Sequence, residues 1–146
     1  MADNGSIARR LYDAWNERNF DEVVKYAAPD AKIVVAGTGD TFSGPEGVRA
    51  YNESWSKGFP DGRITVDHIH TAGDTVVGEF TGHGTHTATM VTSMGEIPAT
   101  GRSVTLKFCD VIEFRDGLIV NQRSYFDSGS MMAQLGLTGQ QATATK

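Results

Sequence analysis

Apolar side chains recur at helical spacing in the first third of the chain. Ile7, Leu11 and Trp15 fall on one stripe, with Ser6 in the position of an N-cap. A similar but shorter stripe follows it, and a later one opens with a proline in its first turn. The predicted helices cover residues 6–18, residues 19–28, where Pro29-Asp30 ends the pattern, and a segment that opens at residues 44–47.

The second half of the chain alternates apolar and polar residues, as strands with one buried face do. Asp116-Gly117 supplies a tight hairpin turn between the last two strands, because glycine accepts a positive φ. Residues 91–102 are interpreted as a long loop. The predicted strands cover residues 31–36, 63–70, 75–90, 103–114 and 118–127, and a last short helix covers residues 130–135.

Helices followed by a run of antiparallel strands indicate the α+β class. We expect the helices to cover one face of a strongly curved, mostly antiparallel sheet. The 146 residues suit a single domain, with a core over about residues 6–137 and a frayed polar tail over residues 138–146. A curved sheet closed by helices encloses a cavity that can hold a small molecule.

Asp127 ends the last predicted strand, and strict alternation places Asn121, Arg123 and Tyr125 on the same face. An amide, a guanidinium, a phenol and a carboxylate together make a poor core and a suitable reaction site. A carboxylate shielded from water can exchange protons near neutral pH. This interpretation places Asp127 in the pocket, near Arg123 or Tyr125, as the proton-transfer residue. The alternative is a solvated strand end at which Asp127 caps the following helix.

Two further titratable residues lie on strand faces that are otherwise apolar or small. Asp110 is the polar residue of the 103–114 stripe, so it either shares a proton with Asp127, acts as the base itself, or is a structural carboxylate. His86 shares a face with three glycines of the 75–90 strand. We expect His86 to face the cavity and to carry a catalytic proton, and His83 to face away. The alternative for His86 is a histidine satisfied by a neighbouring strand.

Aromatic residues on the helical stripes are the candidate substrate-binding residues. Tyr12, Trp15 and Trp55 belong either to a plain core or to the cavity wall, where they would stack on a flat substrate. Arg123 and Tyr125 from the last strand complete the predicted substrate-binding set.

Composition and charge exclude several classes of function. A net charge of -5 and a pI near 5.2 argue against a nucleic-acid partner. The absence of an apolar run of roughly 20 residues and of a signal-like start argues against a membrane and favours a cytoplasmic location. The one cysteine rules out a cysteine-cluster metal site, and His68 with His70 lacks a third ligand, so no metal is expected. Outward-facing positions rich in small β-formers predict a homodimer contact near Thr81, His83, Thr85 and Thr105.

Four stretches of the sequence carry a resemblance to a known family. They are Trp15-Asn16 with Pro29-Asp30, Gly84-Thr-His86-Thr, Ile97-Pro-Ala-Thr-Gly-Arg102, and Arg115-Asp-Gly-Leu-Ile119 running on to Asp127 and Met132-Ala-Gln-Leu-Gly136. Through them, residues 6–137 resemble the SnoaL-like polyketide cyclases, also called ester cyclases, of the nuclear-transport-factor-2-like superfamily.

The resemblance implies a cone-shaped α+β barrel with a deep pocket and no metal or organic cofactor. In the cyclases, an aspartate at the end of the last long strand is the acid/base of an intramolecular aldol closure, and Asp127 matches it by its place before Gln-Leu-Gly. The implied function is a cyclase-like enzyme acting on a polyketide-like or other conjugated carbonyl substrate, with Asp110 or His86 assisting. Two alternatives stay open. One is water activation by Asp110, Arg123 and Asp127, as in the epoxide hydrolases of this superfamily. The other is a non-catalytic module that binds a small hydrophobic ligand or serves as a dimer scaffold.

Overall fold

The computed structural model describes residues 3–93 and 95–137, and the predicted tail over residues 138–146 lies outside them. No helix within these ranges is both long and apolar enough to cross a membrane. In chain order the described elements are α1 (Asn4–Asn16), α2 (Phe20–Lys25), β1 (Ala27–Val35), β2 (Thr41–Ser43), α3 (Gly44–Gly58), β3 (Arg63–Ala72), β4 (Thr75–Thr85), β5 (Met90–Thr92), β6 (Gly95–Ile97), β7 (Ser103–Arg115), β8 (Leu118–Phe126) and α4 (Ser128–Gln134).

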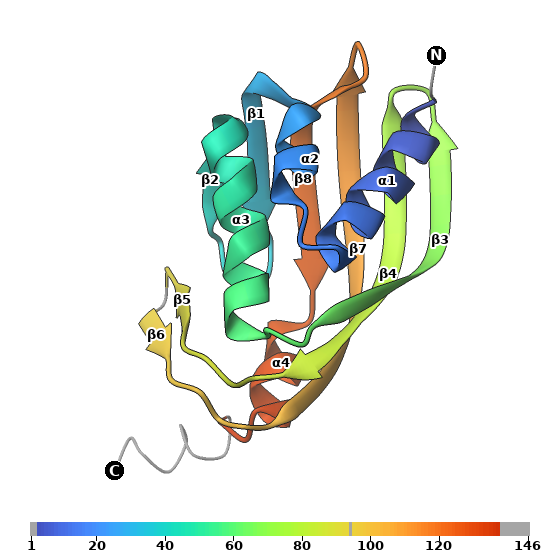
Figure 1. The fold of residues 1–146 in the computed structure, drawn as a ribbon. Helices are drawn as coiled ribbons and strands as arrows, with labels where there is room; N and C mark the ends of the chain where they lie inside the picture. Colours follow the sequence, from blue (N-terminus) through green and yellow to red (C-terminus); the bar gives the residue numbers. More distant parts are fainter. Residues whose placement is uncertain (1–2, 94, 138–146) are drawn as a thin grey trace.

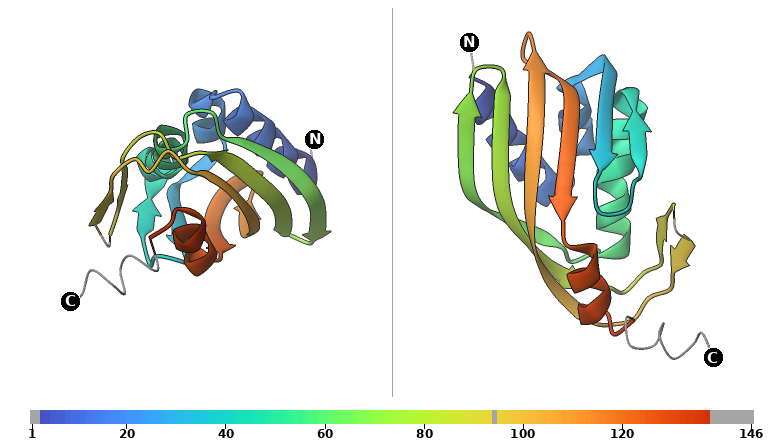
Figure 2. Two further views of the ribbon diagram at one scale, coloured as in Figure 1. Left: turned by 90° about the horizontal axis from the view of Figure 1, so that it is seen from below. Right: turned by 180° about the vertical axis from the view of Figure 1, so that it is seen from behind.

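Six strands form one sheet in the order β2-β1-β8-β7-β4-β3, and β5 pairs with β6 apart from it. Neighbouring strands of the large sheet are antiparallel, except that β1 runs parallel to β8. The three N-terminal helices lie on one face of this sheet (Figure 1). Viewed from below, the sheet curves around that face, and among the described residues its opposite face carries no helix apart from α4 at one end (Figure 2). The predicted α+β fold with a curved, mostly antiparallel sheet is confirmed.

The main core lies between the concave face of the sheet and the helices. Inward-facing apolar residues of the strands meet small and branched residues of α1 and α3, and burying each large one contributes about 1.5–3 kcal/mol. The most deeply buried members are Ala8, Ala14, Ala31, Ile33, Val48, Val76, Ile112 and Ile119. A smaller core surrounds Met131 and Leu135 of α4 and closes the lower end of the sheet.

Several element boundaries differ from the sequence-based expectation. Helix α1 begins at Asn4, because the side chain of Asp3 rather than Ser6 caps it, accepting from the Ser6 amide at 2.7 Å. Helix α2 ends at Lys25, and Pro29-Asp30 lies inside β1. The pairing of β1 with β8 shifts its register between Ala27 and Lys32, which accommodates a proline that has no N–H to donate.

The strand predicted over residues 75–90 ends at Thr85, where its pairing with β7 also ends at Ser103. The predicted long loop over residues 91–102 contains β5 and β6, which form a short antiparallel ribbon at the lower edge of the molecule (Figure 1). Met90 anchors this ribbon, because its side chain packs directly against Gly58 at the end of α3.

A β-bulge in β8 changes which residues of that strand face the core. Phe114 pairs with Ile119, whereas Glu113 pairs with Asn121, so Val120 is an extra residue in β8. Ile119 therefore points inward, and beyond the bulge the inward positions become Gln122, Ser124 and Phe126. Asn121, Arg123 and Tyr125, which strict alternation grouped with Asp127, lie on the outer face instead.

The outer face of β3, β4 and β7 carries more charge than the homodimer prediction assumed. Lys107 Nζ donates to Thr81 Oγ1 at 2.9 Å and lies 3.6 Å from a carboxylate oxygen of Asp67. The dimer stays a prediction. We expect light scattering at micromolar concentration to give twice the chain mass, and a Lys107→Glu change, which places a like charge beside Asp67, to shift the mass toward the monomer. A monomer mass for the unaltered protein would contradict this prediction.

Candidate active site

A cavity of about 100 Å³ lies between the helices and the concave face of the sheet. Its walls are mainly aromatic and aliphatic, and Trp55 packs edge-on against both Phe108 and Phe126 with ring centroids 5.4 and 5.3 Å apart. Its polar lining residues gather in two places. One group is buried beside Asp110, and the other lies at the exposed end near Arg63 and His83.

Asp110 is the buried carboxylate of this cavity, with 3% of its surface exposed. The hydroxyl of Tyr12 donates to Asp110 Oδ2 at 2.9 Å, and Oδ1 has no hydrogen-bond partner among the described residues. Burial raises the pKa of Asp110 to about 6, although the hydroxyls of Ser124 and Tyr12 act in the opposite direction. Asp110 therefore has a free oxygen and a proton affinity suited to general acid–base chemistry near neutral pH.

Gly78 explains how Tyr12 reaches Asp110. It lies on β4 directly opposite Asp110 on β7, and the Tyr12 hydroxyl occupies the space that a Cβ at Gly78 would need. The Tyr12 ring also packs on Phe80, with ring centroids 4.9 Å apart. Burial and the negative charge of Asp110 raise the pKa of Tyr12 well above its ordinary value, so Tyr12 stays protonated and acts as a donor.

Three further polar residues surround the carboxylate. Ser124 faces Asp110 across the β7–β8 pair and is fully buried, and Gln122 Nε2 donates to Ser124 Oγ at 3.2 Å. Tyr51 of α3 lines the same cavity, and burial followed by the charge of Asp110 raises its pKa, so its hydroxyl also stays protonated. Tyr12, Tyr51 and Gln122 thus place hydrogen-bond donors around one buried carboxylate.

The structure places Asp127 outside the cavity, so its predicted position in the pocket is wrong. Asp127 is exposed and is the N-cap of α4, where its side chain accepts from the Ser130 amide at 3.0 Å. The cause is the β8 bulge, which turns the 121, 123, 125 and 127 positions outward. The structure therefore shows the alternative arrangement, in which Asp127 caps the helix that follows the strand.

Arg123 and Tyr125 also lie away from the cavity. Arg123 pairs with Glu113 at 3.8 Å on the outer face, and Tyr125 is 43% exposed. The predicted relay of Asp110, Arg123 and Asp127 is therefore not assembled. Tyr12, Trp15 and Trp55, by contrast, all line the cavity, which is one of the two alternatives that the sequence left open for them.

The expectation for His86 is wrong, because it does not line the cavity. His83 is exposed and lies between the inward-facing Gly82 and Gly84, so it faces away from the core and only borders the cavity at its exposed end. His86 is fully buried beyond the end of β4, and its ring is tilted against that of Phe59 with ring centroids 5.4 Å apart. Its Nδ1 accepts from the Thr100 amide at 3.2 Å, which fixes the 98–102 segment, and burial lowers its pKa. The alternative of a structural histidine fits the contact of Nδ1, while Nε2 is buried without a hydrogen-bond partner among the described residues.

His68 and His70, for which the sequence offers no third metal ligand, lie next to each other on β3. The rings of His68 and His70 stack with centroids 5.9 Å apart, and His70 Nε2 lies 3.1 Å from a carboxylate oxygen of Glu79. Within residues 3–93 and 95–137, no group of three or more histidine, cysteine or acidic side chains is arranged to hold a metal ion.

Replacing Tyr12 by phenylalanine is expected to raise the pKa of Asp110, because the hydroxyl that favours its charged form is removed. A hydrogen bond to a charged group contributes about 1.5–3 kcal/mol, which corresponds to about one pH unit or more. The midpoint in the pH dependence of any reaction in which Asp110 acts as the base should therefore move to higher pH. Tyr125→Phe is the matched control, because it removes an exposed hydroxyl from the outer face. An unchanged midpoint in Tyr12→Phe would contradict the role given to this contact.

Comparisons with known proteins agree on the family. The family model of the SnoaL-like polyketide cyclases matches residues 5–135. The chain is 30% identical to IdmH, a candidate polyketide cyclase from Streptomyces antibioticus, over 93% of this chain and 100% of that one, with a TM-score of 0.75. No curated protein sequence matches it significantly.

More distant solved structures show the same fold. A candidate SnoaL-like polyketide cyclase from Jannaschia sp. CCS1 superimposes with a TM-score of 0.80 at 20% identity, covering 90% of each chain. A protein of ketosteroid isomerase-like fold from Catenulispora acidiphila DSM 44928 gives 0.75 at 20% identity, covering 92% of this chain and 95% of that one. The chain belongs to the SnoaL-like polyketide cyclase family.

Proposed function

We propose that the protein is a cofactor-independent cyclase-like enzyme in which Asp110 is the general base. The observation that supports this most directly is a buried carboxylate that lines an aromatic cavity and has one oxygen without a hydrogen-bond partner among the described residues. The substrate class is a flat, polyketide-like or otherwise conjugated carbonyl compound. The membership of this protein in the SnoaL-like polyketide cyclase family favours ring closure over other reactions.

The proposed reaction is an intramolecular aldol closure. Asp110 Oδ1 removes a proton from the carbon next to a carbonyl, and the electron pair of that C–H bond forms the enolate. The enolate carbon then attacks a second carbonyl carbon of the same molecule, and the resulting alkoxide takes the proton back from Asp110. The hydroxyl of Tyr51 and the side-chain amide of Gln122 are the proposed hydrogen-bond donors to the developing oxyanion, because both residues line the cavity with Asp110.

Positioning of the substrate beside Asp110 supplies the remaining part of the proposed rate acceleration. Tyr12 holds Asp110 Oδ2 and leaves Oδ1 without a partner, and in this proposal the aromatic walls hold the two reacting carbons together. The cavity is smaller than the roughly 300–1,000 Å³ of typical small-molecule sites. A polycyclic substrate therefore enters with an outward movement of a wall residue such as Trp55, which is partly buried.

The binding-module alternative requires only apolar walls, and a buried carboxylate with a raised pKa is a costly feature for a plain carrier. A 1,3-diketone probe in D₂O distinguishes the two functions. The enzyme should accelerate exchange of the α-protons, followed by NMR, and the acceleration should require Asp110. A carrier would bind the diketone without changing its exchange rate.

A further inference from the structure

Two arginines and a histidine from different parts of the chain lie at the exposed end of the cavity. Arg63 at the start of β3 lies opposite His83 of β4, and both line the cavity while remaining exposed to solvent. Arg18 follows α1 and lies beside Trp15, another lining residue, with its guanidinium carbon 4.3 Å from the ring centroid. We call Arg18, Arg63 and His83 the cavity rim.

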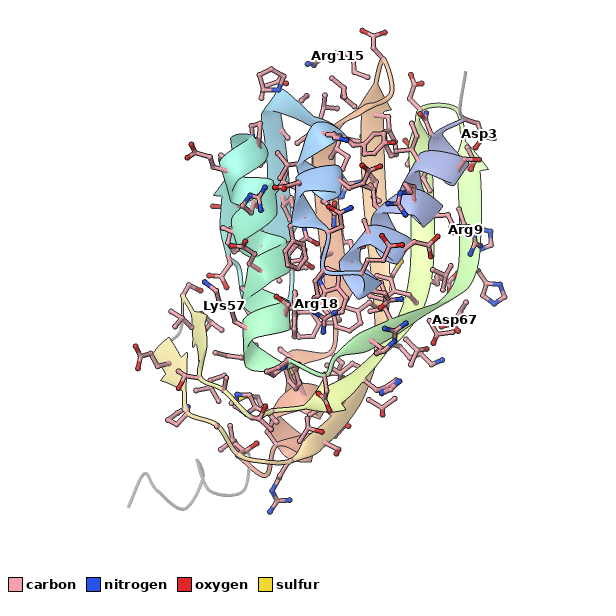
Figure 3. All side chains as sticks on the ribbon, in the orientation of Figure 1. Asp3, Arg9, Arg18, Lys57, Asp67 and Arg115 are labelled. Atoms are coloured by element: carbon pink, nitrogen blue, oxygen red, sulfur yellow. The ribbon has the colours of Figure 1, made fainter. Side chains whose placement is uncertain are left out.

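Backbone contacts fix Arg18 in this place. Its guanidinium donates to the carbonyl oxygens of Trp15, Pro60 and Gly62 at 3.1, 2.9 and 2.8 Å. Burial and then the positive charge of Arg63 lower the pKa of Arg18, and the Gly62 carbonyl to which Arg18 donates is adjacent to Arg63 in the chain. Figure 3 shows Arg18 below the C-terminal end of α1, between α3 and β3.

The two rim arginines lack carboxylate partners. Neither takes part in an ion pair among the described residues, whereas Arg10, Arg49 and Arg115 each pair with an acidic side chain. Asp61 is the acidic residue near the rim, and it accepts from the amide and the hydroxyl of Thr85 at 2.7 and 2.9 Å. Two like charges at the open end of an aromatic cavity, with no carboxylate bound to either, suit an anionic ligand group.

We propose that the cavity rim binds a carboxylate of the substrate, so that the substrate is an elongated, flat keto acid. The proposal rests on the proposed function, because it takes the carbonyl end of the substrate to lie at Asp110. Gly78, opposite Asp110, and His83 are five positions apart on β4, about 17 Å in an extended strand. A small cavity volume spread along such a length is narrow, which favours a thin conjugated ligand over a globular one.

The test compares biphenyl-4-carboxylate with uncharged biphenyl-4-carboxamide by isothermal titration calorimetry. The two probes share size and flatness and differ in charge. We expect the unaltered protein to bind the carboxylate at least about fivefold more tightly than the amide, with the preference shrinking as salt is added. Arg63→Met keeps the length of the side chain and removes the charge, so it should abolish the preference and leave amide binding within about twofold.

Arg9→Met is the matched control, because it removes one positive charge away from the rim, beside β3 (Figure 3). It should retain the full preference. Equal binding of the two probes, a preference that survives Arg63→Met, or no binding of either probe overturns the proposal. The diketone exchange assay is independent of these titrations. Asp110-dependent exchange without a carboxylate preference supports the proposed function and overturns the rim proposal. A carboxylate preference that depends on Arg63, without Asp110-dependent exchange, supports anion binding at the rim and overturns the proposed function.

Discussion

Asp110→Asn is expected to lower the rate of α-proton exchange by about 10² or more, the amount that general-base catalysis supplies. The change keeps the shape of the side chain and removes the carboxylate oxygen that is free to accept a proton. For the unaltered protein, the rate should rise about tenfold per pH unit below pH 6 and level off above it, because Asp110 acts as a base in its charged form. The measurement is the exchange rate of the 1,3-diketone across this pH range.

Asp127→Asn is the matched control for this prediction. It is the same chemical change at an exposed helix cap, and asparagine caps helices about as well as aspartate. Exchange should therefore stay within about twofold of the unaltered rate, with little loss of stability. A large loss of rate in Asp127→Asn together with normal exchange in Asp110→Asn would return the role of base to Asp127, as the family resemblance first implied.

The stability of the protein relative to Asp110→Asn is expected to fall as pH rises. Burial raises the folded-state pKa of Asp110 from 3.8 to about 6. A raised carboxyl pKa favours folding while the group is protonated, so its contribution is complete below pH 3.8 and is lost as pH rises through about 6. The difference in the free energy of unfolding between the two proteins should change by on the order of 3 kcal/mol.

Urea denaturation of both proteins at pH 4 and pH 8 measures this change. Between pH 4 and pH 8, the free energy of unfolding of the unaltered protein should fall relative to that of Asp110→Asn, since the variant has no proton to release at this position. Other titrating groups are shared by the two proteins and cancel in the difference. A difference that stays constant across this range would mean that Asp110 is hydrated in the folded state and would weaken its assignment as a buried base.

The helices and most of the sheet were predictable from the sequence because their signals are periodic. The stripe of Ile7, Leu11 and Trp15 identified both the helix and its inward face, but it could not decide whether Tyr12 and Trp15 belong to the core or to the cavity wall. Asp110 was also identifiable, as the polar residue on an apolar strand stripe, and the structure places it at the cavity.

The faces of β8 were not predictable in the same way, because a bulge leaves no composition signal. One clue was present in the sequence. Ile119 and Phe126 are both apolar but are separated by an odd number of positions, so strict alternation cannot turn both inward. An extra residue between them satisfies both, and it would have identified Gln122 and Ser124 as inward-facing. The rim arginines carried no periodic signal, since their proximity depends on how the turn after α1 meets β3.

The bulge at Val120 separates the residues that line one cavity wall from the length of the strand that carries them. With the extra residue, β8 presents Gln122 and Ser124 to the carboxylate of Asp110. A homologous chain one residue shorter at this point would pair regularly with β7 and would present the same two residues, with Ile119 and Phe126 still in the core. A chain of the same length that paired without a bulge would instead turn Arg123 and Tyr125 inward and Phe126 outward. The strand can therefore gain or lose one residue at this point during evolution while the residues that face the carboxylate stay the same.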